Sequence, residues 1–379
     1  MKLRSPVTGR LLDADTPHSL AAPGPFGVER WPVVDGIPYL RTDSEGLVAV
    51  ALDHLDAGCP DDALVALLTD QDAWWTGPAT SLPELKRLVH ERDTLNLREA
   101  MALLRMGPVA DYFAYRWSDP TYLAGLALLE AHWTEPKTAF ELACGIGHYL
   151  RELTRRGVAC VGADVVFSKC WLAKNWVAPD AEYVVFDAGA RWPVEDERFD
   201  LVMCHDAFYF MPEKENVAAQ LQELVAPKGA LAVSHIHSDR FWAGPKGPAL
   251  SAKEIEKCFP KATLYDEREL ARSLAQGRVP NTTRWEWSAE DGGVEAFSLV
   301  QGGTEEPREL RAGLAMPLPG ADLRPNPLLG PDGAVWPSKR YEEEYEGLSY
   351  WSFVGEDETR LPGNDPVRLR RLVDLPERW

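Results

Sequence analysis

The stretch that decides the fold is Phe140-Glu141-Leu142-Ala143-Cys144-Gly145-Ile146-Gly147-His148-Tyr149-Leu150. Its apolar first half predicts a buried strand, the glycines at 145 and 147 predict a tight turn, and a helix is expected from about 147 onward. Glycine lets the backbone approach a ligand closely, and a helix start offers N–H groups and the positive end of the helix dipole. Many such turns bind nucleotides, and many others only redirect the chain. The stretch alone leaves both readings open.

Acidic residues end the next two predicted strands. The run 158–164 ends in Asp164 and the run 183–187 ends in Asp187, at the carboxyl edge expected of a parallel sheet. Asp164 is suited to accept both hydroxyls of a ribose, and Asp187 to accept from an adenine amino group. The alternative is that each Asp only caps the helix after its strand. Because these two residues and Glu141 fall in register, we expect a site for a small adenosine-bearing cofactor.

A dinucleotide site is disfavoured by the spacing of the glycines. The Gly-x-Gly-x-x-Gly pattern fails because Leu150 stands three residues after Gly147. Starting the pattern at Ala143 fails as well, because His148 then takes the place of the last glycine. An acidic residue two positions before the first small residue instead suits a cationic ligand, such as a sulfonium that also carries an ammonium group.

With these residues the chain resembles the class I S-adenosylmethionine-dependent methyltransferases. Their first motif is an acidic residue followed by alternating small residues, and 141–147 matches it with Ala143 in place of the usual first glycine. The resemblance covers about residues 108–302, including a fourth strand at 199–206 and a helix, turn and fifth strand at 221–233. It implies an α/β fold, a Rossmann-like seven-stranded sheet with helices on both faces.

The resemblance also implies that S-adenosyl-L-methionine is the cofactor. The cofactor-binding residues that it implies are Glu141, Ala143, Gly145, Gly147, Asp164, Asp187, Ala188 and His205. In related enzymes an aromatic residue or an arginine ahead of the sheet closes over the methionine end of the cofactor. Tyr115 and Arg116 are the candidates here.

Polar side chains gather after the fourth and fifth predicted strands. His205 and Asp206 end the fourth strand, Tyr209 lies one turn further on, and His235 and His237 follow the fifth strand. Methyl transfer is an in-line displacement at a carbon already activated by the sulfonium, so the protein mainly positions a nucleophile and removes its proton. A histidine can take that proton at pH 7. The catalytic candidates are therefore His205, Asp206, Tyr209 and His235.

Two other readings of these histidines are open. Each one alone could merely form a hydrogen bond with the backbone at a strand end. A metal site of His205, His235 and His237 is disfavoured, because we expect His235 and His237 to point to opposite faces if the strand continues. No resident metal is expected.

Composition restricts the class of protein. With 40 basic and 59 acidic residues among 379, the net charge of −19 would repel a phosphate backbone, so nucleic acid is not the expected substrate. The six cysteines are scattered without a Cys-x-x-Cys pair, which favours reduced, buried thiols. The start Met1-Lys-Leu-Arg leads into no apolar run, and no stretch approaches the roughly 18 apolar residues of a membrane span. A cytoplasmic protein is the expectation.

Four segments are predicted along the chain. Residues 1–42 resemble the zinc-ribbon-like domain of methyltransferase activators, but Ser5-Pro6-Val7-Thr8 stands in place of its Cys-Pro-x-Cys knuckle. Serine and threonine lack the thiolates that zinc prefers, so this unit is expected to be degenerate and metal-free, with a structural or partner-docking role. A helical lead follows at 43–135, the methyltransferase domain at 136–302 and a proline-rich extension at 303–379.

Local signals mark further elements. Asp119-Pro120 predicts a helix start, while Ser251 with Glu254 and Asp266 with Glu269 have the spacing of capping boxes. Alternating residues on either side of 291–293 predict an antiparallel hairpin at the edge of the sheet. One helix is expected around 339–348.

The leading hypothesis is a methyltransferase that acts on a small molecule. The alternative is a non-catalytic cofactor-binding protein that regulates a partner through the N-terminal unit. An oxidoreductase that uses NAD is disfavoured by Leu150, and a basic protein or peptide substrate stays open because the chain is acidic.

Overall fold

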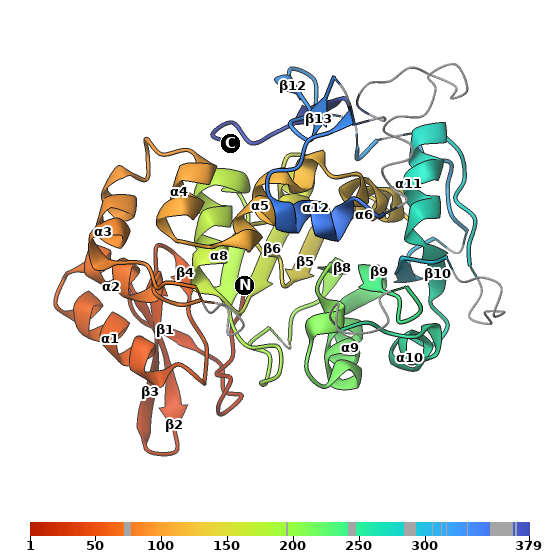
Figure 1. Ribbon diagram of the computed structural model, residues 1–379. Helices are drawn as coiled ribbons and strands as arrows, with labels where there is room; N and C mark the ends of the chain where they lie inside the picture. Colours follow the sequence, from red (N-terminus) through yellow and green to blue (C-terminus); the bar gives the residue numbers. More distant parts are fainter. Residues whose placement is uncertain are drawn as a thin grey trace. The chain divides into compact units, whose positions relative to one another are not determined.

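The computed structural model describes residues 1–71, 77–194, 196–241, 248–283, 293–304, 306–311, 313–315, 317–331, 333–348, 367 and 370–379. The chain divides into two compact units (Figure 1). The first comprises Met1–Ala110, Phe140–Arg198 and Pro376–Trp379, and the second comprises Asp111–Ala139 and Phe199–Leu375. Each unit is discontinuous in sequence, and each is described by itself below.

The main sheet has seven strands, in the order β10-β11-β9-β8-β5-β6-β7. Its strands are β5 (Thr138–Leu142), β6 (Ala159–Asp164), β7 (Glu182–Val185), β8 (Phe199–His205), β9 (Val225–His237), β10 (Thr263–Asp266) and β11 (Ala296–Gly302). β6 pairs with β7 and β8 with β9 in parallel, whereas β11 runs antiparallel to β9 and β10. The predicted α/β fold with a Rossmann-like seven-stranded sheet is confirmed.

In the first unit, helices cover β6 and β7. α7 (His148–Thr154) and α8 (Phe167–Leu172) pack against β6, and α8 also packs against β7. A π-helical turn, η2 (Ala173–Val177), extends α8. β6 and β7 are rich in buried aliphatic residues because helices cover them, as expected for parallel strands.

The N-terminal residues form a small antiparallel sheet. It consists of β1 (Asp13–Thr16), β2 (Ser19–Gly24), β3 (Gly27–Val34) and β4 (Ile37–Pro38), and α1 (Glu45–Asp56) and α2 (Pro60–Leu67) pack against β3. Directly after β4 the chain runs beside β7, where Tyr39 forms a parallel bridge with Val185 and Leu40 N–H donates to Val185 O at 2.8 Å. This segment lies beside the last strand of the main sheet.

Two further helices complete the first unit. α3 (Leu82–Glu91) and α4 (Leu97–Leu103) each begin with a capping box, formed by Ser81 with Glu84 and by Asn96 with Glu99. A reciprocal pair of this kind satisfies two backbone N–H groups that the helix itself leaves without partners. The predicted helical character of the lead segment is thus confirmed in its first part.

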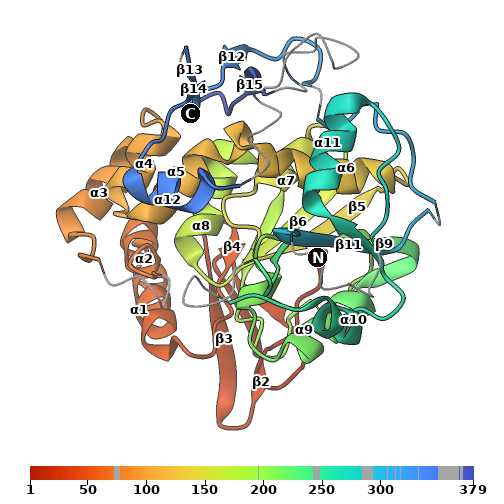
Figure 2. The same ribbon diagram turned by 45° about the vertical axis from the view of Figure 1, so that its right-hand side comes forward.

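In the second unit, helices cover both faces of β8, β9 and β11. Figures 1 and 2 show α6 (Pro120–Ala131) and α11 (Glu267–Gln276) on one side of these strands, with α9 (Lys214–Glu223) and α10 (Ala252–Cys258) on the other. α5 (Pro108–Tyr115) and the 3-10 turn η1 (Arg116–Ser118) precede α6. As predicted, α6 begins at Pro120, and Asp119 caps it by accepting the Thr121 N–H.

In the C-terminal part of this unit, the described residues form short strands and one helix. This part contains β12 (Leu323–Pro325) paired with β15 (Leu372–Asp374), the short pair β13 (Leu329–Gly330) and β14 (Gly333–Ala334), and α12 (Lys339–Tyr345). The helix expected around 339–348 is therefore confirmed. Its two tyrosines, Tyr341 and Tyr345, are buried and stack at 4.4 Å between ring centroids.

Some local predictions need correction. The capping box of Ser251 and Glu254 forms, but Glu269 pairs with Arg278, so Asp266 caps α11 alone through the Arg268 N–H. β7 ends at Val185, two residues before Asp187, because the chain leaves the ladder there.

Only part of the predicted edge hairpin lies within the described residues. Its second arm is β11, whose neighbours are β9 and β10. Most of its first arm, with Trp285 and Trp287, lies outside the described residues. The cysteines agree with expectation, because all six are free and four of them are buried.

Candidate functional site

The glycine turn follows β5 in the first unit. Ala143, Gly145 and Gly147 all have positive φ, at 53°, 54° and 82°. Glycine adopts this conformation at no steric cost, whereas an L-residue pays roughly 1–2 kcal/mol. The usual first glycine of the motif is therefore needed for its backbone conformation, and Ala143 adopts the same conformation under strain.

Asp164 connects the glycine turn to the end of β6. One carboxylate oxygen accepts the Gly145 N–H at 3.0 Å, and the other accepts the Val166 N–H, also at 3.0 Å. Lys169 Nζ lies 3.6 Å from the same carboxylate. Asp164 is buried, yet each oxygen retains a second lone pair that can accept from a ligand. Asp164 accepts the N–H of Val166, the N-cap residue of α8, and not an N–H within the helix itself.

The other predicted cofactor residues also lie in the first unit. Asp187 is half-buried and accepts the Gly189 N–H at 2.8 Å, so it shapes the turn after β7. Ala188 and Glu141 are buried. The Ala188 carbonyl accepts from the Trp192 indole at 3.0 Å, which fixes this turn against the core.

In the second unit a group of side chains surrounds Asp206. We call it the Asp206 group; it comprises Tyr112, Arg116, Asp206, Tyr209, His235 and His237. Tyr112 and Tyr209 donate to the two carboxylate oxygens, Tyr112 to Oδ2 and Tyr209 to Oδ1, each at 2.7 Å. Arg116 is fully buried, with Nη2 3.7 Å from Oδ2 of Asp206 and its guanidinium over the Tyr112 ring.

His235 is held between two carboxylates. Its Nδ1 lies 2.5 Å from Oε2 of Glu267, the first residue of α11, and its Nε2 lies 3.8 Å from Oδ1 of Asp206. The register between β9 and β11 shifts between Phe297 and Leu299, opposite His235. His235 and Asp206 both have positive φ, 55° and 52°. A bulge redirects a side chain at a sheet edge, and strained backbone of this kind gathers at functional sites.

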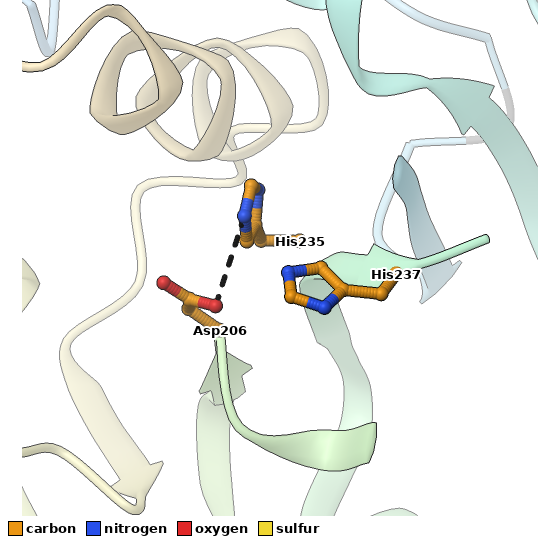
Figure 3. A group of neighbouring side chains, drawn as sticks. All are labelled: Asp206, His235 and His237. Atoms are coloured by element: carbon orange, nitrogen blue, oxygen red, sulfur yellow. Dashed lines mark ion pairs between the residues drawn. The ribbon is translucent and has the colours of Figure 1, made fainter. Parts of the chain in front are cut away.

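His237 points to the same place as His235 (Figure 3). The two imidazole centroids are 5.2 Å apart, and the Tyr209 ring stacks on His237 at 4.2 Å. The expectation that these histidines point to opposite faces was wrong, because residues two apart on a strand share a face. The argument from sequence against a metal site is thereby removed.

His205 ends β8 and is buried. Its Nδ1 lies 2.5 Å from the Ser234 hydroxyl on the neighbouring strand β9, which fixes the orientation of the ring. Of the predicted catalytic residues, Tyr209 donates to Asp206 at 2.7 Å and His235 lies 3.8 Å from it. His205 directly precedes Asp206 in the chain.

Burial and neighbouring charges set the ionisation of these groups. Burial, with Arg116 nearby, lowers the pKa of His205 to about 3, and burial with His235 nearby lowers the pKa of His237 to about 3. Burial also opposes the charged form of His235, but Asp206 and Glu267 outweigh it and raise its pKa to about 9. Burial raises the pKa of Asp206, and the nearby His235 and Arg116 cations outweigh it, so the net pKa is lowered.

Of the two residues proposed to close over the cofactor, one belongs to the Asp206 group. Arg116 contacts Asp206 as described, whereas Tyr115 packs edge-on against Tyr341 at 6.3 Å. Sequence reasoning missed Tyr112 and Glu267. Tyr112 stands in the same aromatic run as Tyr115, and Glu267 lies inside the stretch read as a helix cap, so neither had a signal of its own.

Comparison with known proteins finds similarity to methyltransferases. Residues 140–233 match the family model of the methyltransferase domain. Among solved structures, a TehB-like SAM-dependent methyltransferase from Corynebacterium glutamicum is 16% identical, covers 52% of this chain and 100% of its own, and has a TM-score of 0.37. A SAM-dependent methyltransferase from Thermotoga maritima is 15% identical, covers 52% and 95%, and also has a TM-score of 0.37.

A third structure is an N-methyltransferase from Haemonchus contortus in complex with phosphomonomethylethanolamine and S-adenosylhomocysteine. It is 16% identical, covers 48% of this chain and 49% of its own, and has a TM-score of 0.35. At TM-scores this low the likenesses support nothing about substrate or partner. No curated protein matches the chain.

Residues 140–233 thus match a methyltransferase domain that lies within the seven-stranded α/β fold, and the chain is an enzyme. Its cofactor is S-adenosylmethionine, so the chain is an S-adenosylmethionine-dependent methyltransferase. Within the described ranges, no helix is both long and apolar enough to cross a membrane.

Proposed function

We propose that this enzyme transfers the methyl group of S-adenosylmethionine to a small molecule, with His205 as the proton acceptor. The observation that carries the proposal is the Asp206 group together with His205, a set of polar side chains converging at the ends of β8 and β9. Two residues of this set, Asp206 and His235, also have positive φ.

The first unit holds the cofactor in this proposal. The assigned residues are Glu141, Ala143, Gly145, Gly147, Asp164, Asp187 and Ala188. Asp164 accepts the ribose hydroxyls through its remaining lone pairs, and Asp187 accepts from the adenine amino group. The buried carboxylate of Glu141 favours the cationic methionine end of the cofactor.

The second unit holds the acceptor. His205 is oriented by Ser234, and its lowered pKa keeps the ring neutral at pH 7, so it can accept the proton transiently while the new bond to the methyl carbon forms. Asp206 and Tyr209 position the acceptor, and His235 completes the polar surface beside them. Tyr115 and Arg116, which precede the sheet in the sequence, are assigned in this proposal as the residues that close over the cofactor.

A small acceptor is favoured over a macromolecule. The side chains of Asp206 and His235 are only 8% and 5% exposed, which suits a ligand that can be enclosed. The net charge of −19 disfavours nucleic acid.

The decisive variant is His205→Asn. Asparagine places an amide nitrogen near the position of Nδ1, so it can keep the contact with Ser234 while the Nε2 atom is lost. With methyl-labelled cofactor and a low-molecular-weight metabolite extract, we expect label in small products to fall at least ~100-fold. Binding of S-adenosylhomocysteine should stay within ~3-fold. The matched control is His90→Asn, an exposed histidine of the first unit.

Two outcomes would overturn this proposal. Undiminished transfer in His205→Asn would exclude His205 as the base. Label that appears only in protein or nucleic acid with the wild-type enzyme would exclude the small acceptor.

For the remaining segments we propose the boundaries 1–42, 43–135, 136–302 and 303–379. The N-terminal unit is a metal-free relative of the zinc-ribbon-like domain. The hydroxyl of Ser5 accepts the N–H groups of Val7 and Thr8 and lies 2.5 Å from Glu29, which supports a knuckle-like turn built on hydrogen bonds. The proposal also includes a partner protein that docks on this unit. Stoichiometric zinc bound through residues 1–42 would contradict the metal-free assignment.

A further inference from the structure

Three side chains of the Asp206 group face a common point. Asp206, His235 and His237 each offer one ligand atom, and these atoms lie within 4.8 Å of one another. Figure 3 shows the carboxylate approaching from the end of β8 and both imidazoles approaching from β9. None of the predicted roles of these residues explains why two histidines and a carboxylate converge.

The spacing is close to that of a metal site. With bonds of about 2.1 Å, two ligand atoms on a tetrahedral ion lie about 3.4 Å apart. The distance between His235 Nε2 and Asp206 Oδ1 is 3.8 Å, so this pair needs to close by only a few tenths of an ångström. Since all three ligand atoms lie within 4.8 Å of one another, no pair needs to close by more than about 1.4 Å. Side-chain rotation alone can supply such a movement.

The surroundings of His235 fit a metal ligand. Glu267 is fully buried and bonded to Nδ1, which leaves Nε2 facing Asp206, and a metal ion bound there displaces the proton that His235 otherwise carries. A carboxylate behind a ligating histidine fixes its tautomer and raises its basicity as a ligand. The Ser298 hydroxyl in turn donates to Glu267 at 3.2 Å, so this supporting carboxylate is itself held in place.

The charges around Asp206 are divided between its two oxygens. Tyr112 and Arg116 approach Oδ2, whereas the histidines approach Oδ1. Tyr209 also donates to Oδ1, which has a second lone pair for a cation. Asp206 and Glu267 together place two carboxylates beside His235, so the space between the histidines and Oδ1 favours a cation.

We propose that Asp206, His235 and His237 bind one divalent transition-metal ion. Two imidazoles and one carboxylate suit ions such as Zn²⁺, Fe²⁺ or Co²⁺ better than Mg²⁺ or Ca²⁺, which prefer oxygen ligands. Three protein ligands leave at least one coordination position open, as in catalytic rather than structural sites. A hydroxyl, thiol or amine bound there is polarised toward loss of its proton.

The test uses the full-length protein after treatment with a chelator, with neither cofactor nor acceptor present. Titration with Co²⁺, followed by its visible absorption, should show one equivalent bound, and Zn²⁺ should displace it. In His237→Ala and in Asp206→Asn the affinity for Co²⁺ should fall at least ~100-fold. Glu267→Gln should lower it by about 10–100-fold, because the supporting carboxylate is lost.

Controls separate this site from unfolding and from other metal sites. His90→Asn should bind Co²⁺ like the wild type. Each variant should keep its circular dichroism and its affinity for S-adenosylhomocysteine, and this second measurement also separates failure of the metal proposal from failure of the proposed function. Absence of Co²⁺ and Zn²⁺ binding at micromolar concentrations overturns the proposal. Binding that survives in the double variant of Asp206→Asn and His237→Ala overturns it as well.

Discussion

The glycine turn with Asp164 and the Asp206 group are built in different ways. The first is made of backbone: Asp164 accepts N–H groups from Gly145 and Val166, all within 22 consecutive residues. The second is made of side chains from elements far apart in sequence, from Tyr112 in α5 to Glu267 in α11. Backbone recognition of a fixed cofactor can be compact and local, whereas a site specific to one acceptor depends on side chains that the fold must assemble.

The largest expected effect tests whether the backbone site depends on one carboxylate. Asp164→Ala removes the acceptor of two backbone N–H groups and of the proposed ribose bonds. Charge-assisted hydrogen bonds are worth about 1.5–3 kcal/mol each, so affinity for S-adenosylhomocysteine should fall at least ~100-fold, or about 2.7 kcal/mol. Titration calorimetry measures this. Asp206→Asn is the matched control in the other region, and a loss below ~3-fold in Asp164→Ala would contradict the assignment.

The next largest effect concerns Asp266, which precedes Glu267, the carboxylate that holds His235 in the Asp206 group. Asp266 caps α11 directly before Glu267, and burial with the nearby Glu295 and Glu267 raises its pKa to about 6. An acid with a raised pKa stabilises the folded state below its ordinary pKa of 3.8, and this contribution is lost as the pH rises toward 6. Asp266→Asn keeps a cap without the charge. Urea unfolding should therefore show a gain of about 1–2 kcal/mol at pH 7.5 and almost none at pH 4. An equal effect at both values would refute the explanation.

A smaller effect is expected from Arg41, whose contacts hold the segment that follows Asp164 and the glycine turn. Arg41 donates to Val165 O at 3.1 Å and pairs with Asp70 at 2.8 Å, while Asp70 accepts the Phe167 N–H at 3.4 Å. These contacts hold the segment that follows Asp164. Arg41→Ala should weaken binding of S-adenosylhomocysteine by about 5-fold, which is close to 1 kcal/mol. Arg30→Ala removes an exposed ion pair of the same unit and should leave binding unchanged. Equal losses in both variants would indicate a general effect on stability.

The smallest effect isolates the strain in the turn. Ala143 has a φ of 53°, and glycine relieves that strain but loses more entropy on folding. Ala143→Gly should raise the free energy of unfolding by about 0.5–1 kcal/mol with no change in cofactor affinity. Thermal unfolding monitored by calorimetry provides the measurement. A destabilised variant would mean that the Ala143 methyl group contributes packing that outweighs its strain.

The sequence predicts the first region better than the second for a physical reason. Glycine spacing and strand-ending carboxylates are local patterns, and they correctly indicated β5, β6, the glycine turn and the position of Asp164 at the end of β6. The role of Asp164 in cofactor binding stays a prediction. Glu267 could not be found in this way, because it acts on His235 from 32 residues away and looks like an ordinary helix-starting glutamate. The bulge at His235 depends on how β9 pairs with β11, and no residue of either strand indicates this register in the sequence. The geometry of His235 and His237 therefore required the structure.

The segment after β4 has a consequence for how the chain behaves in solution. An exposed strand at the end of a sheet offers its backbone to other molecules, and natural proteins cover such edges to avoid aggregation. Tyr39 and Leu40 are buried beside Val185 and occupy this position next to β7. The N-terminal unit thus protects its own chain from self-association, and removing it would expose a strand that a second copy could extend.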